Sequence, residues 1–368
     1  MASLKIPLAK PYASEESVEA IRRVLKSGQY IHGNETKEFE NDFASFIGTK
    51  HAVATNSGTA ALHLALLSTG VGDGDEVITV AHTFIATLDS IWYVRARPRL
   101  TDIDGRHYVM NVAEAEALVN SKTRAILPVH LYGHPVDMDP LRNLAQRHGL
   151  KLIEDAAQAH GSRYKGRMAG TLGDVACFSF YPSKNLTVCG DGGILVTNND
   201  EIAQKARILR DHGRTQKYYS ETVGYNYRLS EIASAIGRVG LQHLSRWNDE
   251  RRSIASRYEK LLANNDELVT PAEAEWAHHV YHVYAIRSKR RDKLAEYLAA
   301  NGIQTGVHYP VPCHLQPVFK HLENDNLHLK FTEKTAEEIL SLPIFPGMTT
   351  EEVEYVAAKV KEFHEQQG

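Results

Sequence analysis

Residues 175–198 read VACFSFYPSKNLTVCGDGGILVTN, two apolar runs separated by a lysine and a cluster of glycines. The first run, residues 175–181, has the length and composition of a buried strand and stops at Pro182. The second run, residues 194–197, reads as another strand. Lys184 therefore stands just past the end of a predicted strand, with serines before it and glycines behind it.

A lysine in this position can form a Schiff base with an aldehyde cofactor such as pyridoxal phosphate. A lysine chosen blindly is far more often a surface residue. The segment IEDAAQAHG, residues 153–161, favours the Schiff-base interpretation because it places the carboxylate of Asp155 at the end of another predicted strand. Parallel sheets bind ligands outside the carboxyl ends of their strands, so Asp155 and Lys184 can face one crevice.

The composition is that of a globular protein. The chain has 368 residues, of which 43% are hydrophobic and 24% charged, and its net charge is -3. This charge predicts neither a nucleic-acid nor a membrane partner. The three cysteines are too scattered for a disulfide framework, and no apolar stretch approaches the ~20 residues of a membrane span. Because the N-terminal residues also lack a signal-peptide pattern, we expect a soluble, cytoplasmic protein.

The alternation of short apolar strands with helices predicts an α/β fold with a mostly parallel sheet, covered by helices on both faces. This pattern extends over residues 1–245, which we expect to form a large cofactor-binding domain that includes an N-terminal helix. Residues 246–368 read as a smaller α+β domain. The N-terminal helix is predicted to be capped by Ser14 and to carry Val18, Ile21 and Leu25 on one face. In the C-terminal part we predict a charged helix over 247–262, a strand over 280–286, and helices over 291–300 and from Thr350.

An aldehyde cofactor that acts as an electron sink needs an amine, a carboxylate for its pyridine nitrogen, a surface to stack on and a phosphate cradle. Lys184 and Asp155 are the candidates for the first two. Phe84 follows a strand end and can stack on the ring, although a core phenylalanine is about equally expected. Gln158 can bond the ring hydroxyl, although a glutamine in such a loop is more often structural.

The sequence Ser57-Gly58-Thr59 opens a predicted buried helix, where free backbone N–H groups attract an anion such as phosphate. Gly58 permits close approach and Thr59 adds a hydroxyl, but caps of this composition are common without a ligand. Ser179, five residues before Lys184, can contribute another hydroxyl.

In this order the motifs resemble those of the DegT/DnrJ/EryC1/StrS family of sugar aminotransferases, which are pyridoxal-phosphate enzymes of fold type I. The resemblance runs from Pro7 to about Pro346. The matching segments are SGQY (27–30), NSGTAAL (56–62), TFIAT (83–87), PVHLYG (128–133), EDAAQ (154–158), the Lys184 segment, GYNYRL (224–229) and HYP (308–310).

The resemblance implies that Lys184 is the Schiff-base lysine, that Asp155 pairs with the pyridine nitrogen, and that Gln158 bonds the phenolic oxygen. It implies that Phe84 stacks on the ring and that Gly58, Thr59 and Ser179 hold the phosphate. It further implies a homodimer in which Asn226 reaches the phosphate of the neighbouring subunit. Arg228 matches a position near the nucleotide diphosphate, and His308 and Tyr309 match a loop that contacts the sugar.

The implied reaction transfers an amino group from L-glutamate to a nucleotide-linked keto-deoxysugar, a dTDP-, UDP- or GDP-sugar, for a surface polysaccharide or a glycosylated metabolite. The segments around Lys184, Gly190 to Gly193 and 308–312 are more similar to members that act on 3-keto sugars, whereas NYRL (226–229) also occurs in members that aminate C4. We therefore favour C3. The alternatives are a keto-cyclitol aminotransferase, which Arg228 disfavours, and a pyridoxal-phosphate-binding regulatory protein without catalysis. A dehydratase of the same fold is disfavoured because such enzymes replace the lysine.

Three positions depart from the commoner family pattern, namely His82, His134 and Cys189. Of these, His82 stands near the predicted ring-stacking segment and bears on the shape of the substrate site. The chain contains 19 histidines, but their spacing completes no ligand set, so we expect no metal.

Overall fold

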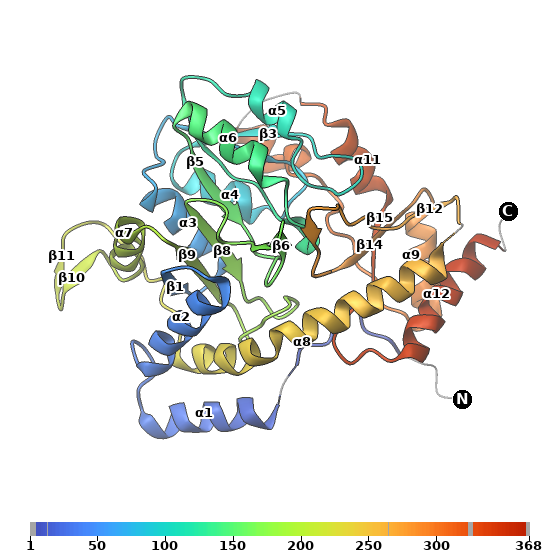
Figure 1. Ribbon diagram of the computed structural model, residues 1–368, viewed down its shortest axis with the longest axis horizontal. Coiled ribbons are helices and arrows are strands. Elements are labelled where there is room, and N and C mark those ends of the chain that lie inside the picture. The colour runs from blue at the N-terminus through green and yellow to red at the C-terminus, as the bar shows by residue number, and fades with distance from the viewer. Residues whose placement is uncertain (1–4, 13, 264, 323–326, 366–368) are drawn as a thin grey trace.

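The computed structural model describes residues 5–12, 14–263, 265–322 and 327–365, and a seven-stranded sheet lies at its centre (Figure 1). The strand order is β1-β9-β8-β5-β4-β2-β3, and within this sheet β9 alone runs antiparallel to its neighbours. The predicted mostly parallel α/β fold is thereby confirmed. The strands are β1 (His51–Thr55), β2 (Glu76–Val80), β3 (Arg97–Thr101), β4 (Thr123–Ile126), β5 (Lys151–Asp155), β8 (Val175–Ser179) and β9 (Gly193–Thr197).

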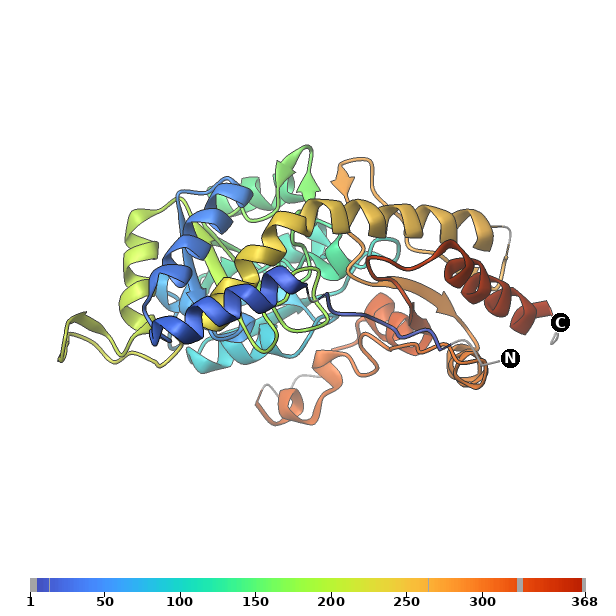
Figure 2. The ribbon, with the colours of Figure 1, turned by 90° about the horizontal axis from the view of Figure 1, so that it is seen from below.

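Helices cover both faces of this sheet. Alternate residues of β8 point to opposite sides, so that Phe178 packs with Phe43 and Trp247 while Cys177 packs with the helix after β1. The elements of this part are α1 (Glu15–Ser27), α2 (Asn34–Ile47), α3 (Gly58–Ser68), α4 (Ala86–Tyr93), α5 (Val112–Ala117), η1 (Leu131–Gly133), α6 (Met138–His148), α7 (Asp200–Arg210), and the short strands β6 (Arg163–Tyr164), β7 (Arg167–Met168), β10 (Arg214–Gln216) and β11 (Tyr219–Ser220). The hairpin β10–β11 projects away from the body of the protein (Figures 1 and 2).

The C-terminal elements surround a second antiparallel sheet of order β12-β14-β15, which has its own apolar core. The helices predicted over 291–300 and from Thr350 are confirmed. The elements are β12 (Leu268–Val269), β13 (Ala277–His278), β14 (Tyr284–Ser288), α9 (Arg291–Ala300), η2 (Cys313–Leu315), α10 (Pro317–Leu322), α11 (Lys330–Glu338), β15 (Ile339–Leu342) and α12 (Thr350–Glu365).

The strand predicted over 280–286 begins four residues late, at Tyr284. The preceding segment bonds elsewhere: His282 N donates to the carbonyl of Tyr132, and Arg251 donates to the carbonyls of Tyr281 and His282. These contacts replace a strand ladder, so the apolar alternation there reflects burial against the large domain.

The charged helix predicted over 247–262 is the second half of α8 (Glu231–Leu262), a single helix of 32 residues. Figure 1 shows α8 running from the large sheet to the small one, so residue 245 lies inside a helix that both parts share. Its N-cap, Ser230, accepts a hydrogen bond from Ala233 N. The start at Glu231 could not be seen from charge alone, because the first turns carry mainly small residues that pack on α1 and α2.

The predicted N-terminal helix is α1, capped by Ser14, and the face that carries Val18 and Leu25 is not the one that it buries. Val18 and Leu25 are 44% and 52% exposed, whereas Ala20 and Val24 pack on Ala235 of α8. The apolar stripe of α1 is thus open to solvent in the single chain.

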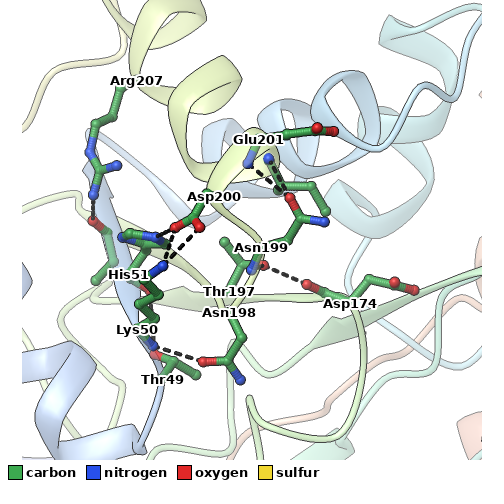
Figure 3. A network of polar contacts seen from close by, with 12 residues as sticks. Thr49, Lys50, His51, Asp174, Thr197, Asn198, Asn199, Asp200, Glu201 and Arg207 are labelled. Carbon is green, nitrogen blue, oxygen red and sulfur yellow. Dashed lines mark hydrogen bonds and ion pairs between the residues drawn. The ribbon is translucent and has the colours of Figure 1, made fainter.

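Polar contacts connect the amino end of β1 to the start of α7 (Figure 3). Lys50 and His51 contact the carboxylate of Asp200, and Asn199 caps α7 by accepting from Glu201 N at 2.9 Å. Exposed ion pairs of this kind contribute little stability. No helix among the described ranges is long and apolar enough to cross a membrane.

Candidate active site

The carboxyl ends of β1, β2, β5 and β8 open into one cavity of about 450 Å³. This is the position at which parallel α/β sheets bind ligands. Nine of the residues predicted for the site line it: Gly58, Thr59, Phe84, Asp155, Gln158, Ser179, Lys184, His308 and Tyr309.

Lys184 lies in the turn after β8, and its backbone N–H donates to the carbonyl of Tyr181 at 2.8 Å. Burial lowers the pKa of its amine to about 8, and the nearby Asp155 carboxylate opposes this shift. A lysine with such a pKa has an appreciable neutral, nucleophilic fraction near neutral pH. Its geometry and its acidity both suit a Schiff-base amine.

Asp155 is the last residue of β5, and its carboxylate is held by two donors. Thr87 donates from its hydroxyl at 2.8 Å and Ala157 from its backbone N–H at 3.1 Å. Burial raises the pKa of Asp155, while these two hydrogen bonds and the charge of Lys184 lower it. A buried carboxylate held in this way is suited to pair with a cationic ring nitrogen.

Gln158 is fixed in one orientation by its neighbours. Its Oε1 accepts from the backbone N–H of Tyr132 at 2.7 Å, and its Nε2 donates to the hydroxyl of Tyr309 at 3.0 Å. The ring of Phe84 lies 5.8 Å from that of Tyr309 and is 54% exposed. Phe84 is therefore a wall of the cavity and not the core phenylalanine of the alternative interpretation.

The N-terminus of α3 forms the narrow end of the cavity. Ser57 caps the helix by accepting from Ala60 N at 3.1 Å. A Cβ added to Gly58 would lie 2.7 Å from Cβ of Ser179, and one added to Gly193 would lie 2.4 Å from the backbone carbonyl of Ser57. Glycine is needed at both places to bring the helix end against the two strands.

These residues fit pyridoxal phosphate. The free N–H groups of α3 with the hydroxyls of Thr59 and Ser179 suit a phosphate, and the buried Asp155 and the partly buried Lys184 suit the ring nitrogen and the aldehyde. The assignment of each residue to an atom of the cofactor stays a prediction.

His82 does not line the cavity. It is buried, and its Nε2 donates to the hydroxyl of Tyr132 at 2.8 Å, which in turn donates to the carbonyl of His308. His82 thus supports the His308–Tyr309 loop from behind. His134 is likewise structural, since it accepts from Ala274 N at 3.1 Å.

Asn226 and Arg228 lie outside the cavity of their own chain. Asn226 is exposed, and its carbonyl accepts from the side chain of Asn56 at 3.2 Å. Arg228 is paired with Asp211, which also binds Arg214. Neither residue lines the cavity of the chain described here.

Two residues of the site carried no signal of their own in the sequence. Thr87 lies within the motif TFIAT (83–87), and only the fold shows that its hydroxyl reaches Asp155. His282 lines the cavity from the far side, more than 90 residues after Lys184 in the chain, and it belongs to none of the motifs of the sequence.

The model of the DegT/DnrJ/EryC1/StrS aminotransferase family matches residues 11–361. A pleiotropic regulatory protein of Geobacillus stearothermophilus is 46% identical over 95% of this chain and 94% of its own length. The dTDP-3-amino-3,4,6-trideoxy-alpha-D-glucose transaminase of Streptomyces venezuelae is 45% identical over 95% of this chain and 92% of its own.

The crystal structure of S. venezuelae DesV in complex with a ketimine intermediate is 44% identical, with a TM-score of 0.95 over 98% of this chain and 99% of the other. A ketimine is an intermediate of amino-group transfer, and solved relatives of this fold hold pyridoxal phosphate. The chain therefore belongs to the DegT/DnrJ/EryC1/StrS aminotransferase family and is a pyridoxal-phosphate-dependent aminotransferase.

Proposed function

We propose that the protein transfers the amino group of L-glutamate to the keto carbon of a nucleotide-linked keto-deoxysugar, with Lys184 as the Schiff-base lysine. The observation that carries this proposal is the convergence of Lys184, Asp155 and the N-terminus of α3 on one cavity in a chain of this family.

When bound, pyridoxal phosphate supplies an electron sink that stabilises negative charge at the reacting carbon and stores the amino group between the two substrates. Lys184, once released as a free amine, carries the proton to and from that carbon. Asp155, held by Thr87 and Ala157, keeps the ring nitrogen protonated. Gln158 orients the cofactor ring by a hydrogen bond to the ring hydroxyl, and the α3 N-terminus holds the phosphate.

We favour amination at C3. The support is the likeness of the Lys184 segment and of residues 308–312 to members that act on 3-keto sugars, and the S. venezuelae relative carries a 3-amino sugar in its name. The proposal that His308 and Tyr309 contact the sugar is supported by their place in the cavity lining, where the Tyr309 hydroxyl accepts from Gln158. In this proposal the nucleotide of the sugar is dTDP, UDP or GDP. We expect its diphosphate to lie near an arginine such as Arg228.

We propose further that two chains share each site. Support comes from the position of Asn226, which is exposed and outside its own cavity, and from the solvent-exposed apolar stripe of α1. In such a homodimer Asn226 completes the phosphate site of the partner and Arg228 approaches its nucleotide. We place the enzyme in the cytoplasm, in the synthesis of an amino sugar for a surface polysaccharide or a glycosylated metabolite.

A regulatory protein without catalysis is the second candidate, because one relative carries a regulatory name. The lowered pKa of Lys184 and the two donors on Asp155 favour catalysis, since a binding protein needs neither. The substrate of a keto-cyclitol aminotransferase carries no diphosphate, so Arg228 would have no such group to bind.

The experiment is to incubate the holoenzyme with L-glutamate and either a dTDP-3-keto or a dTDP-4-keto deoxysugar and to follow the product mass together with 2-oxoglutarate. We expect an amino sugar from the 3-keto compound. Amination of the 4-keto compound alone would overturn the C3 assignment. Cofactor binding without 2-oxoglutarate from any keto-sugar or keto-cyclitol would favour the regulatory protein.

A further inference from the structure

Tyr132 is buried and lies next to the cavity without lining it, yet its main chain holds two residues that do. Its N–H donates to Oε1 of Gln158 at 2.7 Å, and its carbonyl accepts from the N–H of His282 at 2.8 Å. Tyr132 can therefore fix the position of cavity residues without touching a bound molecule itself.

The hydroxyl of Tyr132 holds a third residue of the cavity, because it donates to the carbonyl of His308. This carbonyl lies in the middle of a loop whose two ends are fixed by main-chain hydrogen bonds. The N–H of Gly306 donates to a carbonyl of β15 at 3.2 Å, and the N–H of Cys313 donates to the carbonyl of Ala81 at 3.0 Å. Tyr132 thus connects the middle of the loop to the residues that surround Gln158.

The direction of the hydrogen bond to His308 is fixed by His82. Tyr132 has one hydroxyl proton, which it gives to the carbonyl of His308, so Nε2 of His82 must be the donor to this hydroxyl at 2.8 Å. Burial lowers the pKa of His82 to about 4, so the imidazole is uncharged and carries a single N–H. With that N–H on Nε2, the hydroxyl of Tyr132 is oriented toward the loop.

The main chain of Tyr132 has a φ of 58°, in the left-handed region that glycine adopts at little cost and tyrosine rarely does. Its ring packs edge-on against Tyr108 and His82, with ring centroids 5.8 and 6.1 Å away. Such conformations persist where the surrounding structure enforces them, and they cluster in functional sites. A tyrosine at this place indicates that the side chain is needed.

The same reasoning fixes the direction of the hydrogen bond to Tyr309. Because the N–H of Tyr132 can only donate, Oε1 of Gln158 faces it, and Nε2 of Gln158 donates to the hydroxyl of Tyr309 at 3.0 Å. The proton of that hydroxyl has no acceptor among the residues that the structure describes. Burial raises the pKa of Tyr309, so the proton is retained. Tyr309 lines the cavity and therefore offers a donor to a bound molecule.

We propose that Tyr132 is a positioning residue for the keto-sugar: by joining Gln158 to the His308–Tyr309 loop, it holds the Tyr309 hydroxyl as a hydrogen-bond donor to an oxygen of the sugar. A keto oxygen can accept this hydrogen bond and has no proton to compete with it. Tyr132 itself transfers no proton. This inference rests on the proposed keto-sugar activity and on the predicted contact of Tyr309 with the sugar.

The contact between Tyr132 and the loop is tested by NMR of the holoenzyme without sugar. With ¹³C-carbonyl histidine and ¹⁵N-tyrosine, only His–Tyr peptide bonds give a signal, and the sequence has two of them, His107–Tyr108 and His308–Tyr309. Tyr132→Phe removes the donor, so the carbonyl resonance of His308 moves upfield while that of His107 stays in place. An unmoved His308 resonance in folded Tyr132→Phe overturns the proposal.

Half-reaction kinetics give the second readout. Tyr132→Phe keeps the main-chain hydrogen bond to Gln158, so the glutamate half-reaction keeps its wild-type rate, whereas KM for the keto-sugar rises by roughly 3- to 10-fold. Tyr108→Phe is the control, because this neighbouring hydroxyl is buried and makes no hydrogen bond to His82 or to the loop. Equal losses in the two half-reactions of Tyr132→Phe, or the same rise of KM in Tyr108→Phe, overturn the proposal.

A double-mutant cycle shows whether Tyr132 acts through Tyr309. Residues that act through one another are not additive, so Tyr132→Phe should have no further effect on the keto-sugar KM once Tyr309→Phe is present. Two effects that multiply in the double variant would show that Tyr132 acts independently of Tyr309, and would overturn the proposal.

If Tyr132→Phe does not fold, His82 decides. His82→Leu removes the donor to the Tyr132 hydroxyl, so the His308 carbonyl resonance moves upfield, whereas His82→Gln keeps an N–H donor and leaves the resonance near its wild-type position. An unmoved resonance in both variants overturns the proposal. The NMR measurement needs no sugar. A shifted resonance in an enzyme that aminates no keto-sugar contradicts the proposed function and supports the contact, whereas an active enzyme with an unmoved resonance contradicts the role of Tyr132 alone.

Discussion

At the scale of single residues, Lys184 is the group whose ionisation matters most. With a pKa of about 8, its amine is neutral far more often at pH 7 than an ordinary lysine of pKa 10.5, by roughly 300-fold. The cause is burial beside uncharged imidazoles, and the carboxylate of Asp155 opposes the shift. Burial of the charged amine thus lowers the stability of the folded protein, and the same burial makes the amine reactive.

This cost predicts a pH dependence of the apoenzyme. Between pH 8 and 10.5 the unfolded chain retains the proton of Lys184 and the folded chain does not, so this residue's contribution makes the protein more stable as the pH rises. Lys184→Met removes the buried charge, and its Tm should exceed that of the wild type at pH 7 by a margin that shrinks between pH 8 and 10.5. Lys26→Met is the exposed control. An equal Tm of Lys184→Met and wild type at all pH values would show that Lys184 is not strained by burial.

Thr87 makes a second prediction at this scale. Thr87→Val removes the hydroxyl that donates to Asp155, so the pKa of Asp155 rises further and its hold on a protonated ring nitrogen weakens. A hydrogen bond to a charged group is worth about 1.5–3 kcal/mol, so kcat/KM for glutamate should fall roughly 10- to 100-fold.

Stopped-flow kinetics of the glutamate half-reaction measures this loss. Thr79→Val is the matched control, because the Thr79 hydroxyl is buried but donates to the carbonyl of Leu127 at 2.7 Å. Wild-type rates in Thr87→Val, or an equal loss in Thr79→Val, would contradict the role of Thr87.

Sequence reasoning found most of the residues that meet in the cavity because each follows a strand end or opens a helix. Local order shows that Asp155 ends one strand and that Lys184 follows the end of another, and parallel pairing brings such ends together. It could not find Thr87 or His282, because their roles depend on which side chains face each other across the fold. It also could not place Arg228, whose partner Asp211 belongs to another turn of the chain.

At the scale of elements, the helix α3 and the antiparallel strand β9 together shape the narrow end of the site. Gly193, the first residue of β9, is opposite both Thr55 and Ser179 in the sheet. Its backbone has an ordinary conformation, so its need for glycine is steric: the carbonyl of Ser57 occupies the space of a Cβ.

Gly193→Ala should therefore displace the start of α3 and weaken the phosphate cradle. Overpacking of this kind costs typically about 1–3 kcal/mol, and the affinity for pyridoxal phosphate should fall along with the Tm. Fluorescence titration of the apoenzyme with the cofactor measures the affinity. Gly72→Ala is the control, since its Cβ would meet no atom within 4 Å. An unaltered cofactor affinity in Gly193→Ala would refute the cradle.

The elements that the sequence mispredicted share one cause. The strand over 280–286 and the helix over 247–262 were bounded by local pattern, whereas the true ends depend on Arg251 and on packing against α1 and α2. The face of α1 that carries Val18 and Leu25 is exposed. In the chain described here, small residues on another side of α1 pack on α8.

At the scale of the whole molecule, α8 connects the sheet that carries Lys184 to the part that carries His282, His308 and Tyr309. Arg251 on this helix bonds carbonyls of both the 281–282 segment and Ile344. The cavity is therefore lined by residues from both of these parts, while Asn226 is exposed and does not line it.

A shared site in a homodimer can be tested by mixing two inactive variants. A chain with Lys184→Ala still offers Asn226 to its partner, and a chain with Asn226→Ala retains Lys184. Their heterodimer then has one complete site. After refolding a 1:1 mixture, statistical pairing gives about a quarter of wild-type activity if all sites count equally. No recovery in a mixture that forms heterodimers would place Asn226 and Lys184 in the same chain's site.

The central claim, that Lys184 mediates transfer of the glutamate nitrogen to a keto-sugar, is tested most directly by label transfer. The holoenzyme is supplied with ¹⁵N-labelled L-glutamate and the dTDP-3-keto sugar, beside Lys184→Ala, and the sugar product is weighed by mass spectrometry. We predict a ¹⁵N-amino sugar from the wild type and none from Lys184→Ala. A labelled amino sugar from Lys184→Ala at the wild-type rate, or an unlabelled product from the wild type, would contradict the claim.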